Sequence, residues 1–129
     1  MNPERLLNRF LEYVAIETTS VEGVSEYPSS PGQWQLGQRI VQELRQLGLQ
    51  QVEQDPHGLV WASLPANVDP PGPTIALLAH LDTSPEAPGG PVRPQVIRSY
   101  QGGAIPLPGD PSKILRPEEN PELTRMVGK

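Results

Sequence analysis

The residues with the clearest potential for chemistry in this 129-residue sequence are His80 and Asp82. They directly follow the apolar run 75–79 (IALLA). Alternate residues of an extended chain point to the same side, so the two side chains should project together from the end of that run. A neutral imidazole can ligate a transition metal, and a carboxylate two residues on can orient it or join the metal's outer shell. The alternative to a metal site is that the strand simply ends here, with a histidine exposed to solvent and an aspartate that forms a turn.

Other candidate groups have simpler interpretations. His57 lies inside an Asp-Pro-His-Gly segment, which is a strong turn signal and accounts for its surroundings. Glu118 and Glu119 are adjacent carboxylates of the kind that serve metallohydrolases, but they lie between two prolines and are better interpreted as a solvated pair. The chain has no cysteine, which excludes a disulfide framework, a thiolate nucleophile and a cysteine-type zinc site.

Two helices are predicted in the first half of the chain. Asn2 can cap a helix whose apolar residues recur at helical spacing as far as about Glu17. Ser30 and Pro31 are start signals for a second helix, and Gly48 is placed to end it in a left-handed conformation.

Strand signals follow these helices. Residues 51–54 and 59–64 predict a hairpin, and the apolar run 74–79 predicts a central strand covered on both faces. That strand would place His80 at its carboxyl end, where open α/β sheets bind their ligands. Residues 92–100 could hold a further strand, and the stretch from residue 105 to the C-terminus shows no amphipathic period. Two helices, a hairpin and a buried strand, in this order, indicate the beginning of an α/β domain.

Composition limits the functional classes. A net charge of −5 and a pI near 4.9 argue against a nucleic-acid-binding surface. The longest apolar stretch is far too short to span a bilayer. The first residues, MNPER, do not open a secretory signal, so we expect a cytoplasmic protein without membrane or nucleic-acid partners.

A resemblance to a known family runs through nearly the whole chain. The segments that carry it are ERLLNRFLEYVAIETTS, PSSPGQWQLGQRIVQELRQLGL, SLPANV, HLDTSPE and RSYQGGAIPLPGD. They resemble the tripeptide aminopeptidases of the M20 group of zinc-dependent peptidases. The resemblance implies an α/β catalytic domain interrupted by a smaller lid. Residues 1–129 would be the N-terminal portion of that catalytic domain, incomplete in this chain and without the lid.

The resemblance also implies roles for the histidine and aspartate singled out above. Histidine at the position of His80 ligates one of two zinc ions, and Asp82 supports that histidine and counts among the catalytic residues. A glutamate helps to deprotonate the water that attacks the first peptide bond of a tripeptide. The bridging aspartate, the Glu-Glu pair, a second terminal carboxylate and a later histidine are expected beyond Lys129. Glu118 and Glu119 are not that pair, because the residues around them do not match the motif.

We therefore expect a fragment of a zinc-dependent tripeptide aminopeptidase. A zinc site needs about three or four protein ligands, and this chain supplies one candidate, His80. We expect the isolated fragment to be inactive and to bind zinc weakly. One alternative is another hydrolase of the same group, a carboxypeptidase or an amino-acid deacylase. Another is a non-catalytic module, if the gene ends at Lys129. Exposed strand edges would favour association, so a homo-oligomer is compatible with the sequence.

Overall fold

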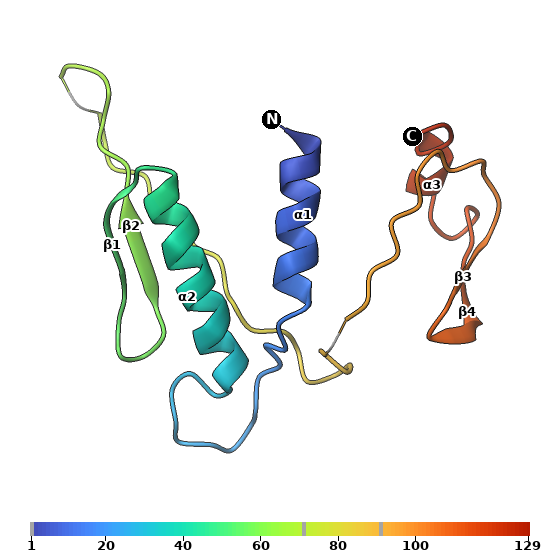
Figure 1. The fold of residues 1–129 in the computed structure, drawn as a ribbon, viewed down its shortest axis with the longest axis horizontal. Coiled ribbons are helices and arrows are strands. Elements are labelled where there is room, and N and C mark those ends of the chain that lie inside the picture. The colour runs from blue at the N-terminus through green and yellow to red at the C-terminus, as the bar shows by residue number, and fades with distance from the viewer. Residues whose placement is uncertain (1, 71, 91) are drawn as a thin grey trace. The chain divides into compact units, whose positions relative to one another are not determined.

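The computed structural model describes residues 2–70, 72–90 and 92–129. Helices and strands both occur, which confirms the predicted mixed α/β character (Figure 1). The chain divides into two compact units, Met1–Arg93 and Pro94–Lys129, and each is described by itself. In order, the elements are α1 (Pro3–Val14), α2 (Pro31–Gln46), β1 (Gln50–Gln54), β2 (Val60–Ser63), β3 (Ile105–Leu107), β4 (Asp110–Leu115) and α3 (Glu122–Arg125).

Helix α1 begins as its capping signal predicts. The side chain of Asn2 accepts a hydrogen bond of 3.2 Å from the backbone N–H of Arg5, which satisfies one of the helix's unpaired donors. The helix ends at Val14, three residues before the predicted end at Glu17. The N–H of Ile16 bonds to the carbonyl of Tyr13, so the last turn tightens and the chain leaves the helix early.

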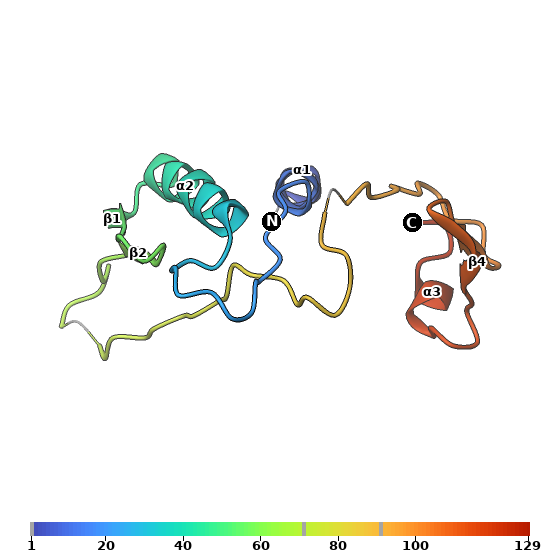
Figure 2. The same ribbon diagram turned by 90° about the horizontal axis from the view of Figure 1, so that it is seen from below.

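Helix α2 packs against the hairpin formed by β1 and β2 (Figure 1 and Figure 2). Leu36 and Val41 are its buried apolar residues. Gly37 allows the close approach, because a Cβ atom there would lie 2.2 Å from Nε2 of Gln54. Gly48 adopts a φ of +80° just beyond the helix, which confirms the predicted end.

The predicted hairpin is confirmed. Strands β1 and β2 are antiparallel, with Gln54 opposite Val60. The carboxylate of Asp55 accepts hydrogen bonds of 2.9 Å from the N–H groups of both His57 and Leu59, which closes the turn between the strands. His57 is therefore part of a turn, as its sequence context indicates.

The predicted central strand at 74–79 is wrong in this structure. The segment carries no strand assignment, and the side chains of Ile75, Leu77 and Leu78 are 82%, 95% and 91% exposed. An apolar run becomes a buried strand only if neighbouring strands accept its hydrogen bonds and other elements cover its faces. Strands β1 and β2 pair with each other, and no described residue pairs with 74–79.

The unit Pro94–Lys129 contains regular structure that the sequence did not indicate. Strands β3 and β4 form an antiparallel hairpin, followed by the short helix α3. No strand forms at 92–100, contrary to the prediction. Tyr100 is instead buried near the end of that segment, where its N–H donates to the carbonyl of Lys129 and its carbonyl accepts from Gly128.

Candidate metal site at His80 and Asp82

The structure brings His80 and Asp82 into contact, as their spacing predicts. The Nδ1 atom of His80 lies 3.1 Å from Oδ1 of Asp82 and 2.9 Å from its backbone oxygen. Both partners are acceptors, so a neutral His80 carries its proton on Nδ1 and leaves the lone pair on Nε2. The side chains are 83% and 45% exposed, which leaves Nε2 accessible to a ligand.

This arrangement fits a metal-binding histidine. Such a histidine typically donates its second ring N–H to a carboxylate or a carbonyl, which fixes the ring and raises its basicity. Asp82 supplies both kinds of acceptor. Within residues 2–70, 72–90 and 92–129, no group of three or more metal-binding side chains comes together. His80 is thus a candidate metal ligand, and Asp82 supplies the acceptors that orient its ring.

A short parallel pairing anchors the chain directly after Asp82. The N–H of Thr83 donates to the carbonyl of Thr18 at 3.1 Å, and the carbonyl of Thr83 accepts from the N–H of Ser20 at 3.0 Å. The hydroxyl of Ser20 donates to the same carbonyl at 3.2 Å. These bonds form an isolated parallel bridge between Thr19 and Thr83. The segment that leads out of α1 therefore holds the residue next to the candidate site.

Three glycines let backbone and side chains pack closely around this segment. A Cβ on Gly32 would lie 1.6 Å from the carbonyl oxygen of Glu17, and one on Gly90 would lie 2.6 Å from the Cβ of the same glutamate. A Cβ on Gly89 would lie 2.0 Å from the hydroxyl oxygen of Thr19, which is buried without a hydrogen-bond partner. The segment after α1 is thus enclosed by the first turn of α2 and by the loop that follows the site.

Charged side chains join α1 to α2 and so help to place that segment. Glu43 of α2 is buried, pairs with Arg9 of α1, and accepts a hydrogen bond of 3.1 Å from the hydroxyl of Tyr13. Arg39 pairs with Glu12 of α1 and lies 3.3 Å from Glu43. Burial raises the pKa of the Tyr13 phenol, and the hydrogen bond to the Glu43 carboxylate adds to the increase.

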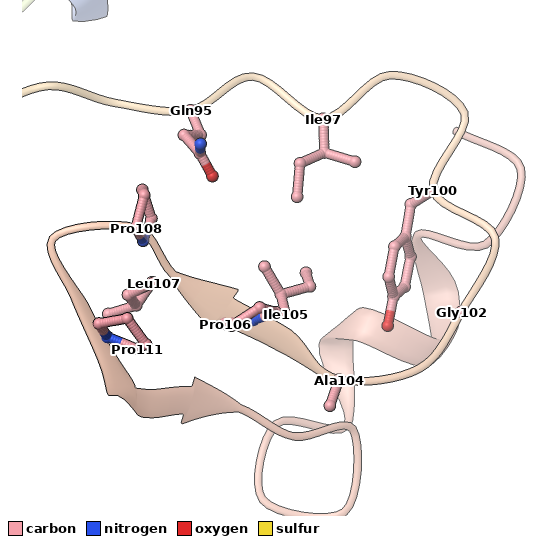
Figure 3. A pocket seen from close by; sticks show the side chains of 10 residues that line it. All are labelled: Gln95, Ile97, Tyr100, Gly102, Ala104, Ile105, Pro106, Leu107, Pro108 and Pro111. Atoms are coloured by element: carbon pink, nitrogen blue, oxygen red, sulfur yellow. The ribbon is translucent and has the colours of Figure 1, made fainter.

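The unit Pro94–Lys129 has an apolar hollow of ≈ 590 Å³ (Figure 3). Ile97 and Tyr100 line it from the segment before the hairpin, and Ile105 lines it from β3. The lining residues include no acid, lysine, arginine or histidine, so the hollow offers no acid–base pair for catalysis. Glu119 lies in a turn, where its N–H donates to the carbonyl of Arg116.

Comparisons with known proteins find relatives that share one name. No family model matches the chain. Curated relatives named peptidase T match almost all of it: the protein from Edwardsiella ictaluri is 47% identical over 124 residues, and that from Geobacillus thermodenitrificans is 44% identical over 125 residues. The relative from Halothermothrix orenii, also named peptidase T, is 42% identical over 125 residues. Over almost its whole length, the chain is therefore similar to a part of peptidase T.

The match covers 96% to 97% of this chain but only about 30% of the length of those peptidase T relatives. Each relative is therefore roughly three times as long as the chain. This coverage is consistent with the prediction that residues 1–129 correspond to the N-terminal portion of a larger peptidase T.

The residues that support the site are those that sequence reasoning missed. Thr18 and Thr83 act through their backbone groups, which leave no signal in the sequence. Gln33 was not singled out, yet it is buried and bonds to the carbonyl of Thr18. Its place in the PSSPGQW segment, which helps to carry the resemblance to peptidase T, is the signal that could have identified it.

Among the described residues, no helix is long and apolar enough to cross a membrane.

Proposed function

We propose that the protein to which this chain belongs is a zinc-dependent aminopeptidase of the M20 group, acting on tripeptides in the cytoplasm. Similarity to peptidase T over almost the whole chain supports the peptidase activity. The observation that carries the metal assignment is the His80–Asp82 contact, in which Nδ1 is engaged and Nε2 is left for a ligand. These 129 residues contain no cysteine, so within them histidine and carboxylates are the side chains that could bind zinc.

The roles of the two residues follow from their geometry. His80 would hold a zinc ion through Nε2, and Asp82 would keep the ring in the required tautomer and orientation. Bound zinc would supply Lewis-acid chemistry, which lowers the pKa of a water and stabilises the charge that develops on a peptide carbonyl. The backbone carbonyl of Asp82 shares the Nδ1 proton with the carboxylate, so the ring is held at two points.

The 129-residue chain alone should not perform this reaction. Catalytic zinc sites use about three protein ligands, and the described residues bring no such group together. We propose that the remaining ligands and the general base belong to the part of the relatives' length that this chain does not span. Robust zinc-dependent hydrolysis of tripeptides by purified residues 1–129 would contradict this assignment.

The decisive experiment uses the protein expressed from the complete open reading frame. His80→Ala should lose bound zinc, measured by elemental analysis, and should lose tripeptide hydrolysis. His57→Ala is the matched control, because His57 lies in the β1–β2 turn and should keep both properties. Unchanged zinc content in His80→Ala would refute the ligand assignment. A panel of tripeptides against acylated amino acids separates the proposed activity from those of a carboxypeptidase or a deacylase.

A further inference from the structure

We propose that Gln33 is a positioning residue for the His80–Asp82 pair and acts through the backbone carbonyl of Thr18. The proposal rests on the function proposed above, because it concerns the same candidate site. Gln33 lies in the first turn of α2 and is only 8% exposed. A long polar side chain in so buried a place needs hydrogen-bond partners, and its partners lead to the site.

The amide group of Gln33 joins two segments. Its Nε2 atom donates to the carbonyl of Thr18 at 3.3 Å and to the hydroxyl oxygen of Ser29 at 3.1 Å. The same Ser29 oxygen accepts the N–H of Val21 at 3.1 Å. Because a primary amide carries two hydrogens and a hydroxyl oxygen has two lone pairs, these bonds can all form together. Thr18 and Val21, the two ends of this segment, are therefore hydrogen-bonded to Gln33 in α2 and to Ser29 just before the helix.

The backbone carbonyl of Thr18 links the Gln33 hydrogen bonds to the His80–Asp82 pair. It accepts both the amide of Gln33 and the N–H of Thr83, which is the residue after Asp82. A carbonyl oxygen held by Gln33 presents a fixed acceptor to Thr83. Fixing Thr83 limits the movement of the Asp82 backbone oxygen, which lies 2.9 Å from Nδ1 of His80. The orientation of the imidazole thus depends on a side chain that touches neither His80 nor Asp82.

An apolar side chain would not replace this function. A methionine at position 33 has nearly the volume of glutamine but no donor, so it would leave the Thr18 carbonyl with one partner. Losing one neutral hydrogen bond is worth about 1 kcal/mol, or about fivefold in an equilibrium constant. The effect should appear first in the bridge between Thr19 and Thr83, because that bridge is isolated and has no sheet around it.

The test measures residues 1–129 without metal or substrate. In Gln33→Met, the hydrogen-exchange protection of the Thr83 amide should fall about fivefold, while that of Val41 within α2 stays unchanged. The imidazole nitrogen shifts of His80 should move from the Nδ1–H toward the Nε2–H tautomer. Gln38→Met is the matched control, since Gln38 lies exposed on the same helix and should change neither signal.

A second variant keeps the test decisive if Gln33→Met disturbs the helix. Gln33→Glu has the same shape as the native side chain but no N–H donor at neutral pH, and it should give the same two changes. Equal loss of protection at Thr83 and Val41 in both variants would show a general structural role and overturn the proposal. An unchanged His80 signal would also overturn it. Neither readout involves zinc, so failure of the His80→Ala experiment would count against the proposed function alone.

Discussion

Replacing Asp82 with alanine separates orientation of the histidine from metal retention. The carboxylate lies 3.1 Å from Nδ1 of His80, and the substitution removes it. The backbone oxygen of Asp82 lies 2.9 Å from the same nitrogen and survives in the variant. The Nδ1 proton therefore keeps one of its two acceptors, so the ring retains its tautomer but loses the negative charge beside it.

The structure sets the expected size of the effect. Removing an outer-shell partner of a metal ligand typically costs about 10- to 100-fold in affinity or activity. The backbone oxygen of Asp82 still accepts the Nδ1 proton in the variant, so the ring keeps one of its two acceptors. The loss should lie at the lower end, at about tenfold in turnover with tripeptide. Zinc content should change by less than about twofold, because the second acceptor remains.

The assay measures zinc content and tripeptide turnover in the protein from the complete open reading frame. Asp82→Asn is the matched variant, because its amide oxygen still accepts the Nδ1 proton but carries no charge. Its turnover should lie between those of the native protein and Asp82→Ala. Unchanged turnover in Asp82→Ala at full zinc occupancy would refute the supporting role. Complete loss of zinc in that variant would show that Asp82 itself holds the metal.

Two further predictions concern the packing that carries the site. Gly37→Ala should lower the free energy of unfolding by about 1–2 kcal/mol in urea titrations, because the new methyl group displaces the Gln54 amide and this loss outweighs the better helix propensity of alanine. In a Gln54→Ala background most of that cost should disappear, because only the Val60 side chain, at 3.3 Å, then remains close to the new methyl group. An undiminished cost would contradict the reasoning. Tyr13 has a raised pKa in the folded chain, so its contribution to stability is intact below about pH 10 and is lost as pH rises through the folded pKa. Tyr13→Phe should reduce the alkaline slope of the unfolding free energy, and an identical slope in both proteins would rule out Tyr13 as its source.

Local signals were sufficient to predict the elements that form within a short span of sequence. The cap at Asn2, the start at Pro31 and the left-handed Gly48 delimit the two helices, and all three features are present. The contact between His80 and Asp82 is equally local, because it follows from the alternation of an extended chain.

Features that depend on distant partners could not be predicted in this way. Residues 74–79 have the composition of a central strand, but a strand needs neighbours, and no described residue pairs with them. The Ser20–Thr83 bond joins residues 63 positions apart and involves backbone groups, which leave no pattern in the sequence. The β3–β4 hairpin could not be predicted from the sequence because Pro106 and Pro111 lie within its strands, and proline argues against a strand. In a hairpin of two strands each strand has a free edge, so the missing N–H groups are tolerated there.

The bridge between Thr19 and Thr83 has a consequence for how the gene can be altered. His80 and Asp82 lie well after residue 20, so a late start codon or a proteolytic cut near residue 20 would spare both residues of the candidate site. Such a product would still lose the backbone partners of Thr83. A truncated protein of this kind would retain His80 and Asp82 but would lack the backbone contacts that hold Thr83 beside them. The resulting defect would resemble the effect of replacing His80 or Asp82, although neither residue had changed.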